Sequence, residues 1–235
     1  MYNVKHSYLI LIFDLQNAKN FTVPSNILFF FLFIFVMQVL DYFAETYGIE
    51  PQKVEIPNMQ HSFEIWSKII TTSEMKPICF EMTGRQGHAN LILELFKWFL
   101  GISDHILPVI VSGLMNKVLT PKDEKAAWKY YQMLDKMENA FEKILGTNGV
   151  FIYPTGPDYA LYHGQALFKP FNVSYTAIFN LLGYPVSQCP IMMSKDGLPI
   201  GLQIVSGLYN DHLTIAVAEE IEKAFGGWVK PPEMM

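Results

Sequence analysis

Apolar residues recur at helix and strand spacings along most of the chain, and this pattern predicts a mixed α/β fold. The clearest helical pattern covers residues 120–146, where apolar side chains return every three or four positions on one face. Thr120 suits the N-cap, Pro121 suits the first helical position, and Gly146 is typical of a helix end. Other helices are expected over residues 39–47, 61–72, 91–100, 106–119, 172–182 and 211–225.

Short apolar runs between these helices are typical of strands. Residues 149–153 read GVFIY, and a shorter run covers residues 53–56. Residues 186–193 and 199–206 are joined by the sequence SKDGL, whose Asp-Gly pair strongly favours a tight hairpin turn. We therefore expect a sheet with helices packed against it.

The first forty residues are unusually apolar. Residues 27–40 read ILFFFLFIFVMQVL, with Gln38 as the one polar residue, and a shorter apolar run over residues 8–13 precedes them. This run of 14 residues is shorter than the roughly 20 that a membrane-spanning helix needs. Three interpretations stay open: a membrane-inserted or interfacial anchor, the start of a buried strand or helix, and an artefactual leader.

The overall composition limits the classes of partner and cofactor. The net charge is −5 and Arg85 is the one arginine, so a surface that reads nucleic acid is not expected. Cys79 and Cys189 are too few for a disulfide framework. The six histidines are scattered, without the paired spacing of zinc ligands. We therefore predict no nucleic-acid partner, no metal and no cofactor.

Residues 179–227 carry a closely spaced set of glycine, proline and polar positions. The set consists of Gly183, Pro185, Pro190, the run GLPIGLQ over residues 197–203, and Asp211. In its order and spacing, this segment resembles the C-terminal part of amidase-signature enzymes. Upstream, the runs VEIPNMQHSFEIW, LFKWFLGIS, GVFIYPTGP and FKPFNVSYTAIF are similar to the fatty-acid amide hydrolase 2 branch of that family.

The resemblance implies a fold and a division of the chain. Residues 39–235 are expected to form the C-terminal portion of the amidase-signature fold, a mixed sheet flanked by helices. This portion would correspond to the latter part of a longer enzyme, so the domain is expected to be incomplete. Residues 1–38 are assigned to an apolar leader or membrane segment outside the family region.

The chemistry of the resembling enzymes has no counterpart in this sequence. Those enzymes cleave amides with a serine nucleophile, which a lysine activates through a second serine, while glycine-flanked N–H groups hold the oxyanion. This chain has no adjacent serine pair, and its one Gly-Gly pair precedes a tryptophan. No catalytic residue is therefore assigned. We expect a truncated amidase that is inactive alone; the alternative is a non-catalytic, membrane-anchored protein that binds lipid or regulates another protein.

The residues that carry the resemblance are interpreted as structural. Gly183 and Gly201 suit backbone geometries or close packing that a Cβ would disfavour. Gln203 lies in an apolar strand, where we expect its amide to satisfy buried backbone groups. Asn210 or Asp211 is expected to cap the last helix, and for Asp211 a cap is preferred to a role as an acid or a base.

The resemblance implies that this half of the fold contributes one wall of a pocket for a lipid amide substrate. His163 lies in a loop that would pass near that substrate, but a loop-packing or solvated role is preferred to general acid–base chemistry. Cys189 lies in an apolar strand and is interpreted as inert. The candidates for the wall, for which plain core packing is the alternative, are Tyr153, Thr155, Phe168 and Met192.

Residues 91–100 and 106–119 form a strongly apolar helical pair. Glu94 and Lys97 are the main charges of the first helix, so little polar face is left. Either the pair is buried, or it forms a membrane-facing hairpin through which a lipid amide would enter. Trp98 beside Lys97 suits a headgroup boundary. The expected location is membrane-associated and intracellular, with the cytoplasm as the alternative, and a homodimer is compatible with the sequence.

Overall fold

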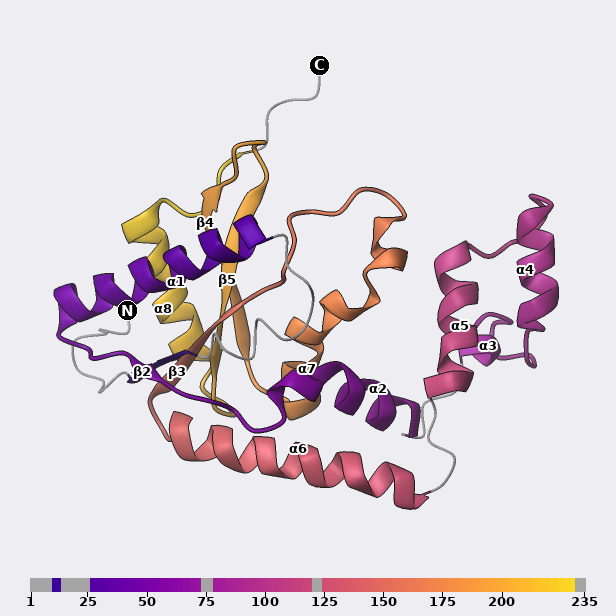
Figure 1. Ribbon diagram of the computed structural model, residues 1–235, viewed down its shortest axis with the longest axis horizontal. Helices are drawn as coiled ribbons and strands as arrows, with labels where there is room; N and C mark the ends of the chain where they lie inside the picture. The colour runs from indigo at the N-terminus through magenta and orange to yellow at the C-terminus, as the bar shows by residue number, and fades with distance from the viewer. Residues whose placement is uncertain (1–9, 14–25, 73–77, 120–123, 231–235) are drawn as a thin grey trace.

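The computed structural model describes residues 10–13, 26–72, 78–119 and 124–230 (Figure 1). Its strands are β1 (Ile10–Phe13), β2 (Gln52–Lys53), β3 (Gly149–Pro154), β4 (Val186–Met193) and β5 (Pro199–Ser206). Within those residues they form one five-stranded sheet in the order β2-β1-β3-β5-β4. β1 pairs in parallel with β2 and β3, whereas β5 pairs antiparallel with β3 and β4. The sheet is therefore mixed, as predicted.

Helices cover both faces of the sheet. They are α1 (Asn26–Tyr47), α2 (Ser62–Thr72), α6 (Glu124–Leu145), α7 (Ser174–Leu182) and α8 (Asp211–Phe225). α1 and α8 share a core with one face of the sheet, and α2, α6 and α7 share a core with the other face (Figure 1). The predicted α/β class is thus confirmed as three layers with the sheet in the middle.

Alternation along β3 explains how one strand supports both helical layers. Val150 and Ile152 belong to the core beneath α1 and α8, while Phe151 and Tyr153 belong to the core beneath α2, α6 and α7. Successive residues of a strand point to opposite faces, and all four side chains are buried. A strand buried on both faces needs apolar residues at every position, which is why this segment reads as a continuous apolar run.

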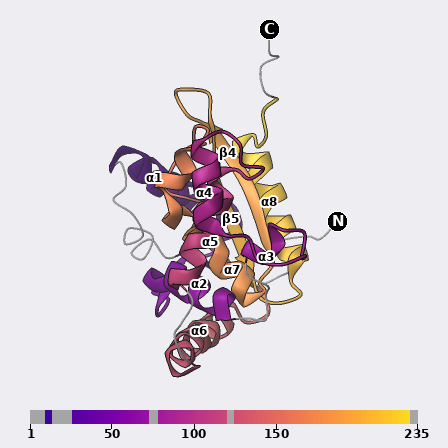
Figure 2. The same ribbon diagram turned by 90° about the vertical axis from the view of Figure 1, so that its right-hand side faces the viewer.

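A small helical group lies beside these layers. It contains α3 (Ile78–Glu81), α4 (Leu91–Phe99) and α5 (Leu107–Leu119), of which α5 contacts both α3 and α4. α5 also contacts α2, and this contact joins the group to the rest of the fold. Figure 2 views the molecule from the side on which α4 and α5 lie.

Helix α1 begins well before its predicted start at residue 39. Its side chains Val36, Val39, Leu40 and Phe43 are fully buried in the core that α1 shares with β3 and α8. Of the three interpretations of the apolar run, these residues favour the start of a buried helix. Among the described residues, no helix combines the length and the apolar character needed to cross a membrane.

Other element bounds also differ from the prediction or cannot be compared with it. β2 has two residues where residues 53–56 were expected, because it pairs with β1 at two positions. The short apolar run over residues 8–13, not predicted as a strand, contains β1. A 3-10 turn, η5 (Pro170–Val173), takes the predicted start of α7. The predicted cap of α6 at Thr120 and Pro121 lies outside the described residues.

Candidate functional site

A pocket of about 260 Å³ lies between the end of β3 and the hairpin formed by β4 and β5. We call it the Thr155 pocket, and it is lined by residues 155–156, 158–160, 188 and 199–201. Its polar side chains are those of Thr155, Asp158, Gln188 and, through its phenolic hydroxyl, Tyr159. The loop after β3 and the motif at the start of β5 therefore meet here, although more than forty positions separate them in the sequence.

Gln203 links three elements of the fold beside this pocket. Its side chain is buried, and its Nε2 atom donates hydrogen bonds to the carbonyl oxygens of Pro154 and Tyr175, both at 2.8 Å. One amide group thus joins β5 to the end of β3 and to the first turn of α7. The prediction that Gln203 satisfies buried backbone groups is confirmed.

Gly201 allows the strands on the pocket's other side to approach closely. A Cβ on Gly201 would lie 2.5 Å from the Cys189 carbonyl oxygen and would also overlap the Gln188 amide. Gln188 in turn accepts a hydrogen bond from the Thr155 hydroxyl. Gly183 ends α7 with a φ of 72°, a left-handed geometry that glycine adopts readily. Both predicted glycine roles are confirmed.

Asp158 holds the loop that forms the outer wall of the pocket. Its two carboxylate oxygens accept hydrogen bonds from Lys169 Nζ at 2.7 Å and from Asn172 Nδ2 at 2.9 Å. The other side-chain atom of Asn172, Oδ1, is buried and meets no hydrogen-bond donor within the described part of the chain. These hydrogen bonds therefore link the start of the loop that follows β3 to its end.

The four predicted wall residues are only partly brought together. Thr155 lines the pocket, and Met192 packs against Ile200, which also lines it. Tyr153 is buried in the core beneath α7, whereas Phe168, at the end of the 3-10 turn η4 (Gln165–Phe168), is 86% exposed. Of the four, Thr155 alone lines the pocket and Met192 lies behind one of its lining residues, and a role in substrate binding stays a prediction for all of them.

Local geometry also bears on three single-residue predictions. His163 is exposed in its loop, in keeping with the solvated role. Cys189 is buried as predicted, and burial, and secondarily the Glu222 carboxylate, raises the pKa of its thiol to about 11, which is in keeping with low reactivity. Of the two residues predicted to cap α8, the structure selects Asn210 over Asp211. Asn210 takes the N-cap position, and its amide donates to a backbone carbonyl of the turn before β3.

The Thr155 pocket provides recognition groups without a nucleophile and base. As far as the chain is described, its lining contains the Thr155 and Tyr159 hydroxyls, a carboxylate and an amide, and no serine, lysine, histidine or cysteine. Serine-type catalysis needs a hydroxyl next to a base, whereas the Thr155 hydroxyl donates to an amide oxygen. The pocket is therefore suited to hold a polar group beside an apolar one, with Tyr159 and Ile200 as the apolar contacts.

Helix α4 is exposed, so the buried alternative for it is wrong. Ile92, Phe96 and Phe99 are 75%, 61% and 81% exposed, and their spacing places them on one face of the helix. Trp98 is also exposed, whereas Leu91 is buried against Gly113 of α5. One side of α4 packs on α5, and the apolar opposite side has no cover within the described residues.

Sequence reasoning missed Asp158 and Gln188. Gln188 meets Thr155 across 33 positions of sequence, and Asp158 meets its partners across 11 and 14 positions. Gln188 lies directly opposite Gln203 in the hairpin. This pairing depends on a β-bulge between Pro190 and Met192, which shifts the register by one residue, so the position of the turn alone does not predict it.

Comparisons with known proteins agree with this geometry. A family model described as amidase matches residues 38–215. Fatty-acid amide hydrolase 2 from Homo sapiens is 39% identical over 193 residues, which cover 78% of this chain and 35% of the human protein. Fatty-acid amide hydrolase 2-A from Danio rerio is 40% identical over 189 residues, with the same two coverages. The chain thus spans about a third of the length of these relatives.

Solved structures share the fold at low sequence identity. The crystal structure of an amidase superposes with a TM-score of 0.62 at 16% identity, covering 96% of this chain and 47% of that chain. The structure of 6-aminohexanoate cyclic dimer hydrolase complexed with substrate superposes with a TM-score of 0.61 at 16% identity, covering 95% and 46%. At such identities, the likeness establishes the arrangement of strands and helices and leaves the activity open.

Proposed function

Because the chain belongs to the amidase family, we propose that it is part of a fatty-acid amide hydrolase and that its Thr155 pocket forms one wall of the amide-binding site. The observation that carries this proposal is the position of the pocket. Three segments that resemble the family meet there: the loop after β3, the strand β4, and the start of β5. The named relatives that are about 40% identical act on fatty-acid amides, which supports a lipid amide as the substrate class.

The second part of the proposal is that this chain alone does not hydrolyse amides. Its sequence has no adjacent serines, and the Thr155 pocket has no nucleophile with a neighbouring base in its described lining. The chain would then supply substrate contacts, and the reacting serine would belong to a portion of the enzyme that this sequence does not contain.

The test combines turnover with binding. The purified chain is incubated with a long-chain fatty-acid amide and with an aryl amide, beside a serine amidase that validates the assay, and the released acid is measured. We expect no product above the buffer rate. Hydrolysis that a serine-directed inhibitor abolishes would refute the proposed inactivity.

Binding tests the pocket separately. Ala160 lines the Thr155 pocket, so Ala160→Trp should fill it and abolish binding of a fluorescent fatty-acid amide. Ala224→Trp, at an exposed position of α8 outside the pocket, is the matched control and should bind normally. Equal affinity of both variants would place the amide site elsewhere.

A second candidate function rests on the exposed face of α4. Ile92, Phe96 and Phe99 form an apolar stripe, and Lys97 lies beside Trp98 on the same helix. An amphipathic helix of this kind inserts its apolar face into the headgroup region of a bilayer. The chain would then be a membrane-associated, lipid-binding or regulatory protein, whether or not it takes part in catalysis.

Vesicle flotation distinguishes this function. The chain should float with phosphatidylcholine vesicles, and the double variant Phe96→Ser and Phe99→Ser should stay at the bottom of the gradient. Trp128→Ser with Tyr131→Ser, which removes two exposed aromatics from α6, is the matched control. If the α4 variant still floats, the apolar stripe does not bind lipid; if it instead loses a dimer seen by light scattering, a second copy covers α4.

A further inference from the structure

Strand β4 leaves one edge of the sheet open. Among the described strands it has β5 on one side and no strand on the other. The Ser206 N–H donates to the Pro185 carbonyl at 3.2 Å, so these opposed residues form a hydrogen-bonded pair. Because such pairs alternate along an antiparallel ladder, the backbone groups of Val186 and Gln188 point away from β5, toward the open edge.

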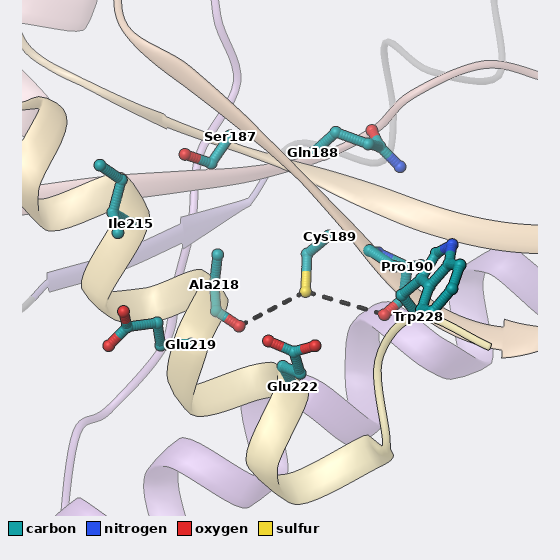
Figure 3. Close-up of a pocket in the computed structure, with 9 residues that line it drawn as sticks. All are labelled: Ser187, Gln188, Cys189, Pro190, Ile215, Ala218, Glu219, Glu222 and Trp228. Carbon is teal, nitrogen blue, oxygen red and sulfur yellow. Dashed lines mark hydrogen bonds between the residues drawn. The ribbon is translucent and has the colours of Figure 1, made fainter. Parts of the chain in front are cut away.

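Helix α8 overhangs this edge. Ile215, Glu219 and Glu222 follow one another at the spacing of a single helix face, and all three are exposed. Beneath them lies a second pocket, of about 360 Å³, between α8 and β4 (Figure 3). We call it the Cys189 pocket; it is also lined by Pro190, Ala218 and Trp228.

The segment after α8 completes the pocket. The chain turns back at Gly227, whose φ is 57°, and a Cβ there would lie 2.7 Å from a carboxylate oxygen of Glu222. This turn sets the Trp228 ring at the pocket, opposite the helix. The result is an apolar slot with a carboxylate rim, because Glu219 and Glu222 line it together with the indole.

The rim is negatively charged and its two carboxylates have no ion-pair partner among the described residues. Glu220, between them in sequence, points elsewhere and is occupied by Tyr42, Tyr47 and Lys223. Carboxylates beside an aromatic ring favour a cation that carries an apolar stem, since the stem contacts the ring while the charge meets the acids.

We propose that the open edge of β4 binds an extended, basic peptide segment of another protein, with one lysine or arginine side chain in the Cys189 pocket. A strand added to this edge would lie about 4.8 Å from β4, and every second side chain would point toward α8. The backbone of the segment would pair with the outward groups of Val186 and Gln188. Its basic side chain would run along Trp228 to Glu219 and Glu222.

The charges argue against a second copy of this chain as the occupant. An isologous pairing would place β4 against β4, and its sequence VSQCPIMM contains no basic residue that could reach the pocket. The partner is therefore expected to bring its own cation.

A defined peptide tests the proposal. We expect the amidated, acetylated pentapeptide Thr-Val-Lys-Val-Thr to bind the full chain in isothermal titration calorimetry. Replacement of its lysine by norleucine, and the double variant Glu219→Gln and Glu222→Gln, should each weaken binding about tenfold. Asp135→Asn with Glu142→Gln, which removes two exposed carboxylates from α6, is the charge-matched control and should bind normally.

A separate variant tests whether the peptide backbone pairs with β4. Val186→Pro removes an outward-pointing N–H at an edge position where proline is tolerated, so the peptide should bind more weakly while the melting temperature changes little. Equal binding of the lysine and norleucine peptides would overturn the proposal. If a single lysine with a blocked α-amino group and carboxyl group binds as tightly as the pentapeptide, the proposal is also overturned. A self-association of the chain that Val186→Pro abolishes would overturn it as well.

Discussion

Replacing Gln203 by leucine tests whether this glutamine is a scaffold residue. In the native chain its Nε2 atom donates to the carbonyl oxygens of Pro154 and Tyr175, and its side chain is 2% exposed. Leucine fills a similar volume and cannot donate. The change therefore removes both hydrogen bonds while leaving the apolar packing nearly intact.

The expected loss follows from the two acceptors. The Pro154 carbonyl, at the end of β3, loses this donor in a buried site, which costs about 1–3 kcal/mol. The Tyr175 carbonyl lies in the first turn of α7, where a helical N–H also reaches it, so its loss is about 1 kcal/mol or less. We expect a net decrease in the free energy of unfolding of about 2–3 kcal/mol.

Urea unfolding followed by tryptophan fluorescence measures this decrease. A second variant, Gln203→Glu, tests the same two hydrogen bonds through the dependence of stability on pH. A carboxylate facing two carbonyls raises its own pKa, because neutral glutamic acid donates one hydrogen bond and the anion donates none. A group whose folded pKa is raised binds more protons when folded, so this variant should gain stability as the pH falls through that value. If Gln203→Leu is as stable as the native chain, the carbonyls do not depend on Gln203 and the reasoning fails.

Three further predictions concern single side chains. Hydrogen bonds from two α1 tyrosines, Tyr47 foremost, lower the pKa of Glu220, so Glu220→Gln should cost about 1–2 kcal/mol near pH 7. In urea melts at decreasing pH that cost should shrink, because the native carboxylate loses its contribution as the pH falls through the lowered pKa. Gly201→Ala should destabilise by about 1–3 kcal/mol in thermal melts, since the new methyl meets backbone of β4. Burial raises the pKa of Cys189 to about 11, so iodoacetamide should alkylate it about tenfold more slowly than Cys79 in the native chain and equally fast in urea.

The sequence predicted the parts of the fold that local patterns determine. The two strands of the β4–β5 hairpin were placed correctly because an Asp-Gly turn separates two apolar runs, although the bulge in β4 was not predicted. Gln203 and Gly201 were interpreted correctly, since a polar residue or a glycine inside an apolar strand needs a specific reason. The C-terminal portion of the amidase-signature fold is confirmed by the family match and by the superposed structures.

Long-range pairing accounts for what the sequence did not predict. Thr155 was selected and Gln188 was not, although the two side chains share one hydrogen bond across two strands. Asp158 was not selected because its partners, Lys169 and Asn172, are 11 and 14 positions away and meet it only when the loop folds back. Tyr153 was chosen because its strand leads to the pocket, but the alternation of β3 turns it into the core.

The amidase match begins inside helix α1, so the end of the apolar run belongs to the same helix as the first matched residues. The match begins at residue 38, whereas α1 covers Asn26–Tyr47. Val36, Val39, Leu40 and Phe43 follow the spacing of one helix face, and all four are buried in the same core. Val36 precedes the match and the other three lie within it, yet all four are buried by the same helix face. The described end of the apolar run is therefore continuous with the fold, and deleting residues 1–38 would remove core packing together with any separate role of that segment.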